Sequence, residues 1–194
     1  MPEPTSARPT SARSSTVEEV ILLDAQYRPI GTAPKATVHT ENTPLHFAFS
    51  CWVLDDDGRV LLTRRALSKK TWPGVWTNSF CGHPGPGEDP REAVARRARQ
   101  ELGLEIGDLT EVLPDFSYRA VDASGIVENE FCPVWTARAA SALRVQPSEI
   151  AETTWVEPAD LLTAARGIPR VFSPWLVEEI AEAPLQRALG VHGR

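Results

Sequence analysis

One helix in this chain has both of its ends marked in the sequence, more clearly than any other element. Asp89 is a good N-cap residue, Pro90 suits the first helical position, and Glu92 completes a pattern that resembles a capping box. Gly103 is the residue type that commonly follows the last turn of a helix. The sequence therefore predicts a helix that begins after Asp89 and runs through the apolar positions 93, 94, 98 and 102.

Short apolar runs on both sides of this helix predict strands. The clearest pair is a hairpin, in which Asp57-Gly58 forms the turn between strands at 45–54 and 59–63. The expected fold class is α+β, with mixed or antiparallel β-sheets flanked by helices. The remaining expected elements are strands at 20–23, 112–119, 126–137 and 155–156, a turn region at Pro29 and Gly31, an ordered loop at 66–80, and helices at 158–165 and 174–189, the last broken at Pro184.

Length, charge and cysteine count limit the organisation further. The 194 residues suit one domain at 17–190, and a monomer is the default at this size. Residues 1–16 lack an apolar core, so we expect a disordered tail and no secretory signal. No apolar run approaches the length of a membrane span, and the net charge of −6 argues against general nucleic-acid binding. Three cysteines without an export signal favour free thiols in a reducing cytoplasm.

Two short motifs carry the side chains best suited to chemistry. The stretch 78–84 places the thiol of Cys81 two residues from the imidazole of His83, in a loop that leads to the predicted helix. Glu128 and Glu130 share one face of a predicted strand, because side chains alternate with a period of two. Taken alone, a Cys-x-His is commonly structural and a Glu-x-Glu is commonly a solvated face. Their meaning depends on the residues around them.

The segment from Gly82 to Leu104 can be written Gly82-x5-Glu88-x7-Arg96-Arg97-Ala98-Arg99-Gln100-Glu101-Leu102-Gly103-Leu104. It resembles the Nudix signature, a loop and helix whose carboxylates bind Mg²⁺ and a diphosphate. Two positions depart from that pattern, since Arg97 and Gln100 stand where the family has glutamates. The resemblance therefore implies a retained metal ligand at Glu101 and a weakened hydrolytic apparatus.

Further motifs occur along the chain: 63–70 (TRRALSKK), 72–79 (WPGVWTNS), 81–84 (CGHP), 118–120 (YRA), 125–130 (GIVENE) and 172–175 (FSPW). Together they resemble the type 1 isopentenyl-diphosphate isomerase family over residues 17–180. The resemblance implies a Nudix-like fold and an enzyme of isoprene biosynthesis, which interconverts isopentenyl and dimethylallyl diphosphate. It further implies a small-molecule prenyl diphosphate as partner, a tertiary carbocation as intermediate, and no flavin.

The same resemblance implies two metal sites. The first would hold one Mn²⁺ or Zn²⁺, and imidazole and carboxylate ligands suit either ion. The second would hold Mg²⁺ together with the substrate diphosphate, and Mg²⁺ commonly takes few protein carboxylates beside phosphate and water. The implied ligands are His39, His46, His83, Glu128 and Glu130 in the first site, and Glu101 with the backbone carbonyl of Cys81 in the second.

The resemblance assigns the diphosphate to four cations: Lys35, Arg65, Lys69 and Arg97. A solvated charge run at 64–70 and a helix-surface salt bridge from Arg97 to Glu101 stay open as alternatives. The indole of Trp175 would face the carbocation, since an aromatic face attracts a positive charge. Its alternative is a role as a core anchor for the last helix.

The resemblance also implies the groups that move protons. Glu130, with Tyr118 as a hydroxyl relay, would protonate the alkene, and Cys81 would handle the allylic proton. An unperturbed thiol with a pKa of about 8.5 could act in either protonation state. Two other functions stay open at this point. One is a Nudix pyrophosphohydrolase acting on a nucleotide or prenyl diphosphate, and the other is a non-catalytic Nudix-like binding module.

Overall fold

The computed structural model describes residues 18–191 and contains two mixed sheets. The tail expected at 1–16 lies outside the described residues. The first sheet has the order β2 (Pro29–Pro34), β1 (Glu19–Leu23), β3 (His46–Phe47), β10 (Val127–Phe131) and β9 (Ser117–Val121). The second has the order β12 (Ile150–Val156), β5 (Val60–Arg65), β4 (Phe49–Leu54), β11 (Val134–Ala139) and β8 (Ile106–Leu113), with β6 (Trp76–Thr77) paired to β5 and β7 (Phe80–Gly82) paired to β4.

Two chain segments pass side by side from one sheet to the other. β3 and β4 are separated by Ala48, and β10 and β11 are separated by Cys132 and Pro133. β3 pairs parallel with β10, and β4 pairs parallel with β11, so the two segments form a continuous seam between the sheets. The register at this seam places His46 opposite Glu130. Residues 84 positions apart in sequence therefore meet where the sheets join.

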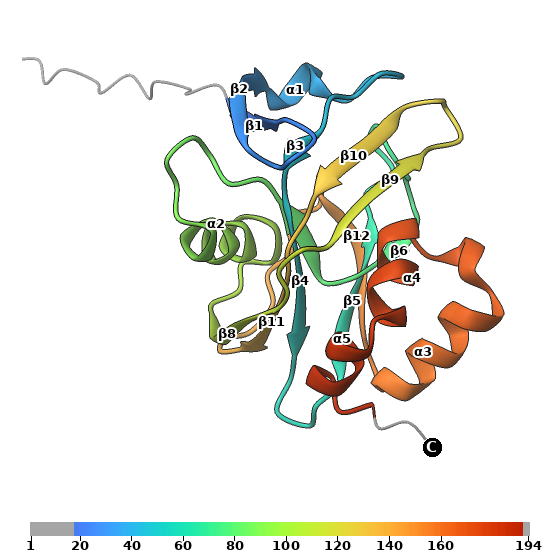
Figure 1. Cartoon of the computed structure of the whole chain (residues 1–194). Helices are drawn as coiled ribbons and strands as arrows, with labels where there is room; N and C mark the ends of the chain where they lie inside the picture. The colour runs from blue at the N-terminus through green and yellow to red at the C-terminus, as the bar shows by residue number, and fades with distance from the viewer. Residues whose placement is uncertain (1–17, 192–194) are drawn as a thin grey trace, which may run out of the picture.

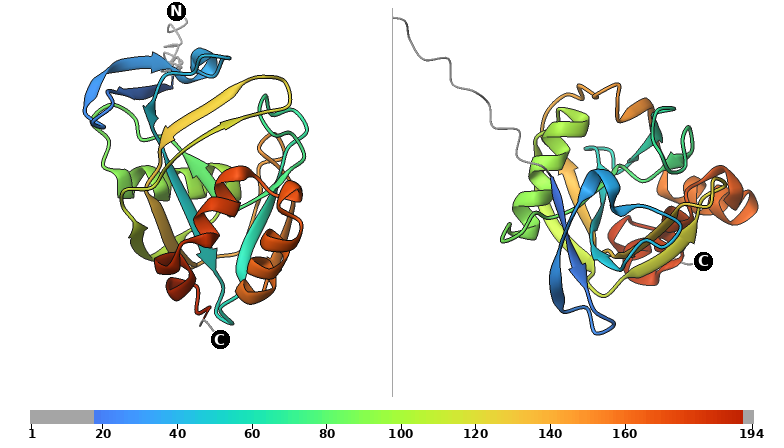
Figure 2. Two further views of the ribbon diagram at one scale, coloured as in Figure 1. Left: turned by 45° about the vertical axis from the view of Figure 1, so that its right-hand side comes forward. Right: turned by 90° about the horizontal axis from the view of Figure 1, so that it is seen from above.

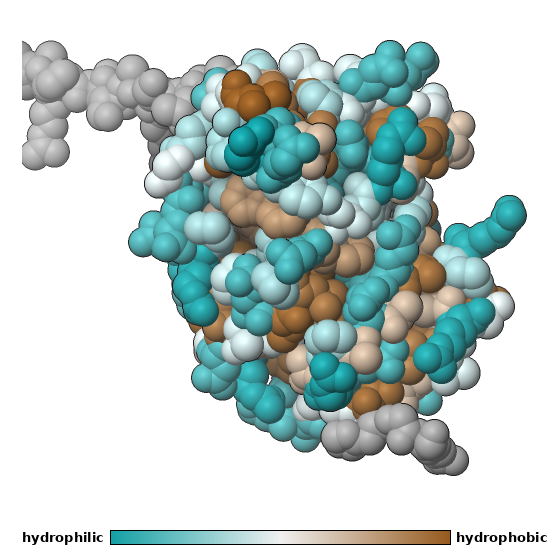
Figure 3. All heavy atoms as spheres, in the orientation of Figure 1, coloured by the Kyte–Doolittle hydropathy of each residue, from teal (hydrophilic) through white to brown (hydrophobic). Residues whose placement is uncertain are grey.

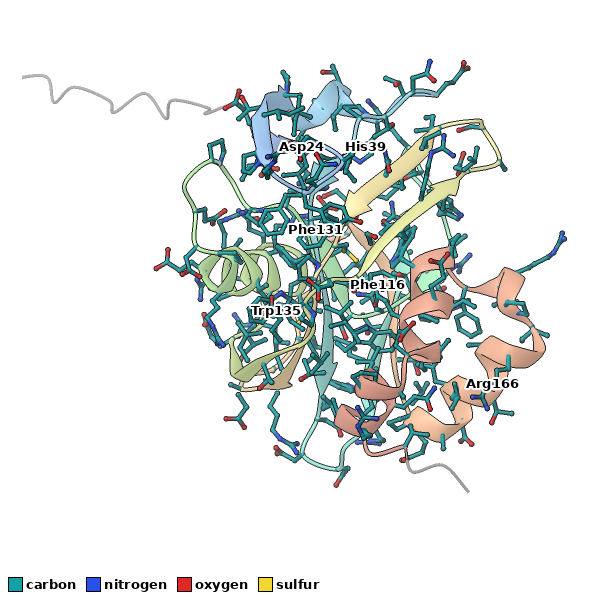
Figure 4. All side chains as sticks on the ribbon, in the orientation of Figure 1. Asp24, His39, Phe116, Phe131, Trp135 and Arg166 are labelled. Atoms are coloured by element: carbon teal, nitrogen blue, oxygen red, sulfur yellow. The ribbon has the colours of Figure 1, made fainter. Side chains whose placement is uncertain are left out.

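Helices cover both faces of the second sheet (Figures 1 and 2). α2 (Pro90–Arg97) lies on one face, and α3 (Pro158–Gly167), α4 (Pro174–Ala181) and α5 (Ala183–Ala188) lie on the other, while the short α1 (Lys35–Val38) sits beside the first sheet. Each face has its own buried core, with Trp135 among the residues under α2 and Trp52 among those under α4. Figure 4 shows Trp135 on the α2 side and Phe116 on the α4 side. The central strands β4, β5 and β11 are thus buried on both faces.

The predicted helix at 89–102 is confirmed, including both of its ends. The Asp89 carboxylate accepts a hydrogen bond from the backbone N–H of Arg91 at 2.7 Å, as an N-cap should. The helix continues beyond α2 into a π-helical turn at Ala98–Leu102 and ends at Gly103, whose φ of 57° is left-handed. A Cβ on Gly103 would lie 2.6 Å from the carbonyl oxygen of Arg144. The glycine is therefore required by both its conformation and its neighbour.

Four sequence-based expectations about strands are wrong in detail. Pro29 and Gly31 lie inside strand β2 rather than in a turn, and the turn that precedes β2 covers residues 25–27. The strands expected at 45–54, 112–119 and 126–137 are each divided between the two sheets. Pro114 and Pro133 lie at the last two of these breaks, and proline lacks the N–H that a central strand must donate. The break near Pro184, between α4 and α5, is confirmed.

The outer surface shows polar and apolar side chains together (Figure 3), with the apolar ones in several groups. Among residues 18–191, none of the helices combines the length and the apolar character that crossing a bilayer requires.

Candidate active site

A cavity of about 490 Å³ opens where the two sheets and the loop at 66–75 meet. His46 lies behind His83, fully buried, and the other side chains that the sequence singled out line this cavity. The structure therefore brings all of these residues together from distant parts of the chain. Those that line it are Lys35, His39, Arg65, Lys69, Cys81, His83, Arg97, Glu101, Tyr118, Glu128, Glu130 and Trp175.

One end of the cavity holds a cluster of imidazoles and a carboxylate. His39, His46, His83 and Glu130 each direct one ligand atom to a common point, with these atoms within 4.8 Å of one another. The Nε2 atoms of His46 and His83 are 3.2 Å apart, and Glu130 Oε1 is 3.1 Å from His83 Nε2. Glu128 stands beside this group, with Oε2 3.1 Å from His39 Nε2. Figure 4 shows His39 between α1 and β10.

The donor set of this cluster fits a divalent ion. His46 Nδ1 lies 2.9 Å from the carbonyl oxygen of Pro44, so Nδ1 carries a ring proton and Nε2 is the nitrogen that faces the cluster. His39 Nε2 is buried, and although Glu128 Oε2 lies 3.1 Å away, none of the residues at 18–191 offers this nitrogen a well-aligned hydrogen bond. Imidazole nitrogens with one or two carboxylate oxygens are typical ligands of Zn²⁺ and Mn²⁺. The cluster could therefore hold either ion.

The protonation states in this cluster suit the same purpose. Burial alone would raise the pKa of Glu130, but hydrogen bonds from His46 and His83 outweigh it and hold that pKa well below its usual range. Burial lowers the pKa of His83 to about 4, so this imidazole is neutral at neutral pH. The Tyr118 hydroxyl donates to Glu130 Oε2 at 3.0 Å, and burial raises its pKa well above the usual range. The cluster thus combines an ionised carboxylate, a neutral imidazole and a protonated phenol.

Cys81 contributes its thiol to the wall of the same cavity from strand β7. Its Sγ lies 3.5 Å from Asn78 Oδ1, to which the thiol can donate. Burial raises the pKa of Cys81 well above its usual range, and Glu179 adds to this effect once it is ionised. The assumption of an unperturbed thiol is therefore wrong in this fold, because the closed wall stabilises the neutral S–H form.

Cations paired with carboxylates form another part of the cavity lining. Lys35 Nζ is 2.8 Å from Glu18, Lys69 forms an ion pair with Glu149, and Arg97 forms one with Glu101. The Arg97–Glu101 salt bridge that the sequence left open is present, but it is buried and lines the cavity. Gly82 makes room for it, since a Cβ there would lie 2.7 Å from Arg97 Cγ. The oxygens of a bound diphosphate could replace these carboxylates as partners of Lys35, Lys69 and Arg97.

Aromatic side chains form another part of the cavity wall. Trp175 is 2% exposed, and its indole meets the ring of Trp72 edge to face, with ring centroids 5.3 Å apart. The guanidinium of Arg65 lies 5.4 Å from the centre of the Trp175 ring and donates to the Thr71 carbonyl oxygen at 2.9 Å. Trp175 therefore anchors α4 and also lines the cavity. Its position is compatible with both roles considered from the sequence, the core anchor and the aromatic face beside a carbocation.

Sequence reasoning missed several residues of this site. The Thr71 hydroxyl donates to Glu128 Oε1 at 2.7 Å, and Glu149 holds Lys69 while lying 3.9 Å from Arg97. Asn78 belongs to a conspicuous motif but had no assigned role. Thr71 and Glu149 lie in loops with no local pattern, so only the tertiary structure reveals them.

Comparison with known proteins agrees with this architecture. The NUDIX domain family matches residues 44–176. An isopentenyl-diphosphate Delta-isomerase of Kocuria rhizophila is 60% identical over 92% of this chain and 99% of that protein. Proteins of the same name from Agromyces mediolanus and Corynebacterium glutamicum are 57% and 56% identical, over 98% and 91% of this chain and 91% and 96% of theirs.

Solved structures show the same fold at much lower sequence identity. The structure of DR0079 from Deinococcus radiodurans aligns with a TM-score of 0.65 and 21% identity, over 84% of this chain and 98% of that one. A MutT protein from Methanosarcina mazei aligns with a TM-score of 0.57 and 19% identity, over 75% and 96%. These likenesses concern the fold, and they match the expected α+β class.

Proposed function

The chain belongs to the Nudix family and, within it, to the isopentenyl-diphosphate Delta-isomerases, and from this premise we propose that it is an enzyme that interconverts isopentenyl and dimethylallyl diphosphate in isoprene biosynthesis. One observation supports this activity above the others. A thiol, Cys81, and a carboxylate with its phenol, Glu130 and Tyr118, line one cavity that also carries a cationic end. The reaction needs this arrangement, because one proton is added to the substrate and another is removed.

The proton balance of the reaction follows from these groups. Isopentenyl diphosphate gains a proton at its terminal CH₂ from Glu130 with Tyr118, and the electrons of the C=C bond form the new C–H bond; this direction starts from a protonated carboxyl and a thiolate. The resulting tertiary cation loses a proton from C2 to the Cys81 thiolate, and that C–H pair becomes the new double bond. The reverse reaction starts from the protonation states described for the site, with the Cys81 S–H as the donor and the Glu130 carboxylate as the acceptor. The indole face of Trp175 stabilises the cation, and the closed wall keeps water from trapping it.

The remaining site residues hold the substrate in place. Lys35, Arg65, Lys69 and Arg97 bind the diphosphate, and this releases the carboxylates that are now paired with Lys35, Lys69 and Arg97. Glu101 and the Cys81 carbonyl would hold Mg²⁺, while His39, His46, His83, Glu128 and Glu130 would hold Mn²⁺ or Zn²⁺. When bound, Mg²⁺ would neutralise part of the diphosphate charge, and the ion in the imidazole cluster would orient Glu128 and Glu130.

Three finer features belong to the same proposal. The residues at 17–190 act as a single domain and as a monomer. The partner is a small prenyl diphosphate, and no flavin is needed for a reaction without net electron transfer. Cys51, Cys81 and Cys132 are free thiols, which suits a reducing cytoplasm.

A Nudix pyrophosphohydrolase is the alternative function. Hydrolysis in that family depends on signature carboxylates, but two of those positions are Arg97 and Gln100. The remaining signature carboxylate, Glu88, does not line the cavity. Its two oxygens accept hydrogen bonds from the Arg96 guanidinium at 2.7 Å and from the backbone N–H of Gly85 at 2.8 Å. This geometry favours the isomerase.

The deciding experiment follows isopentenyl diphosphate in D₂O by NMR, with purified protein, Mg²⁺, and either Mn²⁺ or Zn²⁺. We expect dimethylallyl diphosphate with deuterium in a methyl group. Release of phosphate or diphosphate without any isomer would instead establish the hydrolase. An unchanged substrate under all metal conditions, with properly folded protein, would contradict both and favour a binding module.

A further inference from the structure

A carboxyl group is buried behind the part of the cavity wall that Cys81 and Trp175 form, which we call the catalytic wall. Glu179 in α4 has no exposed surface. Its Oε2 accepts hydrogen bonds from the Ser50 hydroxyl at 2.8 Å and from the Trp52 indole N–H at 2.6 Å, whereas its Oε1 has no partner among the described residues. Burying a carboxyl group with an unpaired oxygen lowers the free energy of unfolding, so its presence at this place points to a role beyond packing.

Asn78 connects this carboxyl to the reacting groups. Its amide Nδ2 donates to the Ser50 hydroxyl at 2.8 Å and to the backbone carbonyl of Phe80 at 3.0 Å. Its Oδ1 accepts from the Trp175 indole N–H at 3.0 Å and from the Cys81 thiol at 3.5 Å. The indole can only donate and the carbonyl can only accept, so these partners fix which way the amide points.

The backbone arrangement reinforces these contacts. Trp175 and Glu179 are four residues apart in α4, so both side chains leave the same face of the helix. Ser50 lies opposite Cys81 in the register of β4 and β7. α4 thus carries Glu179, which binds Ser50 in β4, and Trp175, which binds Asn78. Asn78 also binds Ser50 and so connects the two helix side chains.

We propose that Glu179 is a positioning residue. It acts through Ser50 and Asn78 to hold the Cys81 thiol and the Trp175 indole at fixed positions on the catalytic wall. Glu179 touches neither the substrate cavity nor the thiol, so it is not itself a catalytic residue. The inference rests on the proposed isomerase, because it assigns the network to the two groups that handle the proton and the cation.

The test compares three single variants of the full chain. Glu179→Leu removes both accepted hydrogen bonds, and Glu179→Gln keeps a carbonyl oxygen that can accept them. Glu178→Leu is the matched control, because it makes the same substitution one residue earlier, at an exposed position. For each protein we would measure kcat, KM for isopentenyl diphosphate, and the rate at which iodoacetamide alkylates Cys81 at fixed pH, read by peptide mass spectrometry.

We expect Glu179→Leu to lower kcat by about 10- to 100-fold, the scale of a small misplacement of reacting groups. KM should change little, because the diphosphate cations lie on other elements, and alkylation of Cys81 should become several-fold faster as the thiol loses its fixed position. Glu179→Gln should recover most of kcat and the slow alkylation, and Glu178→Leu should match the wild type.

Two results would overturn this role. One is a Glu179→Leu variant with wild-type kcat and alkylation rate. The other is a loss of kcat in which Glu179→Gln is as impaired as Glu179→Leu while alkylation stays unchanged. If Glu179→Leu does not fold, Ser50→Ala replaces it, since that variant removes only the hydroxyl between the carboxyl and Asn78. An inactive wild type would contradict the proposed function instead, and the alkylation rates would still test the network.

Discussion

Cys81 allows the most direct test at the scale of single residues. Cys81→Ala removes the thiol that handles one of the two protons, so turnover should fall below about 1% of wild type, in line with the usual contribution of a general acid or base. Isomer formation by NMR measures this, with circular dichroism to show that the fold is retained. Cys51→Ala is the control, because Cys51 is a second free thiol that is fully buried in the core under α2 and does not line the cavity. Substantial activity in Cys81→Ala would remove the thiol from the mechanism.

Glu179 predicts a pH dependence of stability. Burial, with the charges of Glu130 and Glu178, raises its pKa to about 8, despite the hydrogen bonds from Ser50 and Trp52. An unfolded glutamate titrates near pH 4.3, at about its ordinary value, so the native state keeps a proton that the unfolded chain loses. The contribution of protonated Glu179 to the free energy of unfolding is therefore fully present below about pH 4.3. As the pH rises from there to about 8, this contribution is lost at about 1.4 kcal/mol per pH unit.

Glu179→Gln should abolish this dependence, because an amide does not titrate. Urea unfolding between pH 5 and pH 8 should show the variant gaining free energy of unfolding relative to wild type as the pH rises. Glu182→Gln, at an exposed position near the end of α4, should stay parallel to wild type. Parallel curves for wild type and Glu179→Gln would mean that the carboxyl is already ionised in the folded protein.

The end of the signature helix provides a test at the scale of an element. Gly103→Ala places a Cβ in a left-handed conformation and 2.6 Å from the Arg144 carbonyl oxygen. We expect it to lower the free energy of unfolding by at least about 1–2 kcal/mol. Denaturant unfolding measures the loss, and Gly107→Ala is the control, since a Cβ there meets nothing within 4 Å. Equal stability of the two variants would show that Arg144 moves aside easily.

The same elements show what a sequence can and cannot specify. Asp89 and Gly103 act on their own neighbours, so the ends of that helix could be predicted from local patterns. The division of 126–137 at Pro133 depends on which strand pairs with which, and the apolar run does not contain that information. In the site, motifs pointed to Cys81 and Glu130 through a family resemblance. Glu149 and Glu179 carry no motif, since their partners are 80 and 129 residues away.

At the scale of the whole molecule, the imidazole cluster gathers its side chains from four separate segments of the chain. His39 follows α1, His46 lies in β3, His83 follows β7 and Glu130 lies in β10. Two of them are thus neighbours in the first sheet, while His83 lies in the loop that leads from β7 of the second sheet to α2. An ion held by all of them would therefore stabilise the folded molecule as a unit, because the unfolded chain cannot gather these ligands.

Metal binding should accordingly appear in the thermal stability of the whole protein. Protein stripped with EDTA should regain stability when Mn²⁺ or Zn²⁺ is added, by about 2.7 kcal/mol at a free ion concentration 100 times the dissociation constant. His46→Ala should lose this response, because His46 is the buried imidazole whose tautomer is set by Pro44. Mg²⁺ alone should not replace the added ion, since nitrogen ligands suit transition metals and Zn²⁺ better. A melting temperature that is indifferent to Mn²⁺ and Zn²⁺ in wild type would mean that these imidazoles pack against one another without holding an ion.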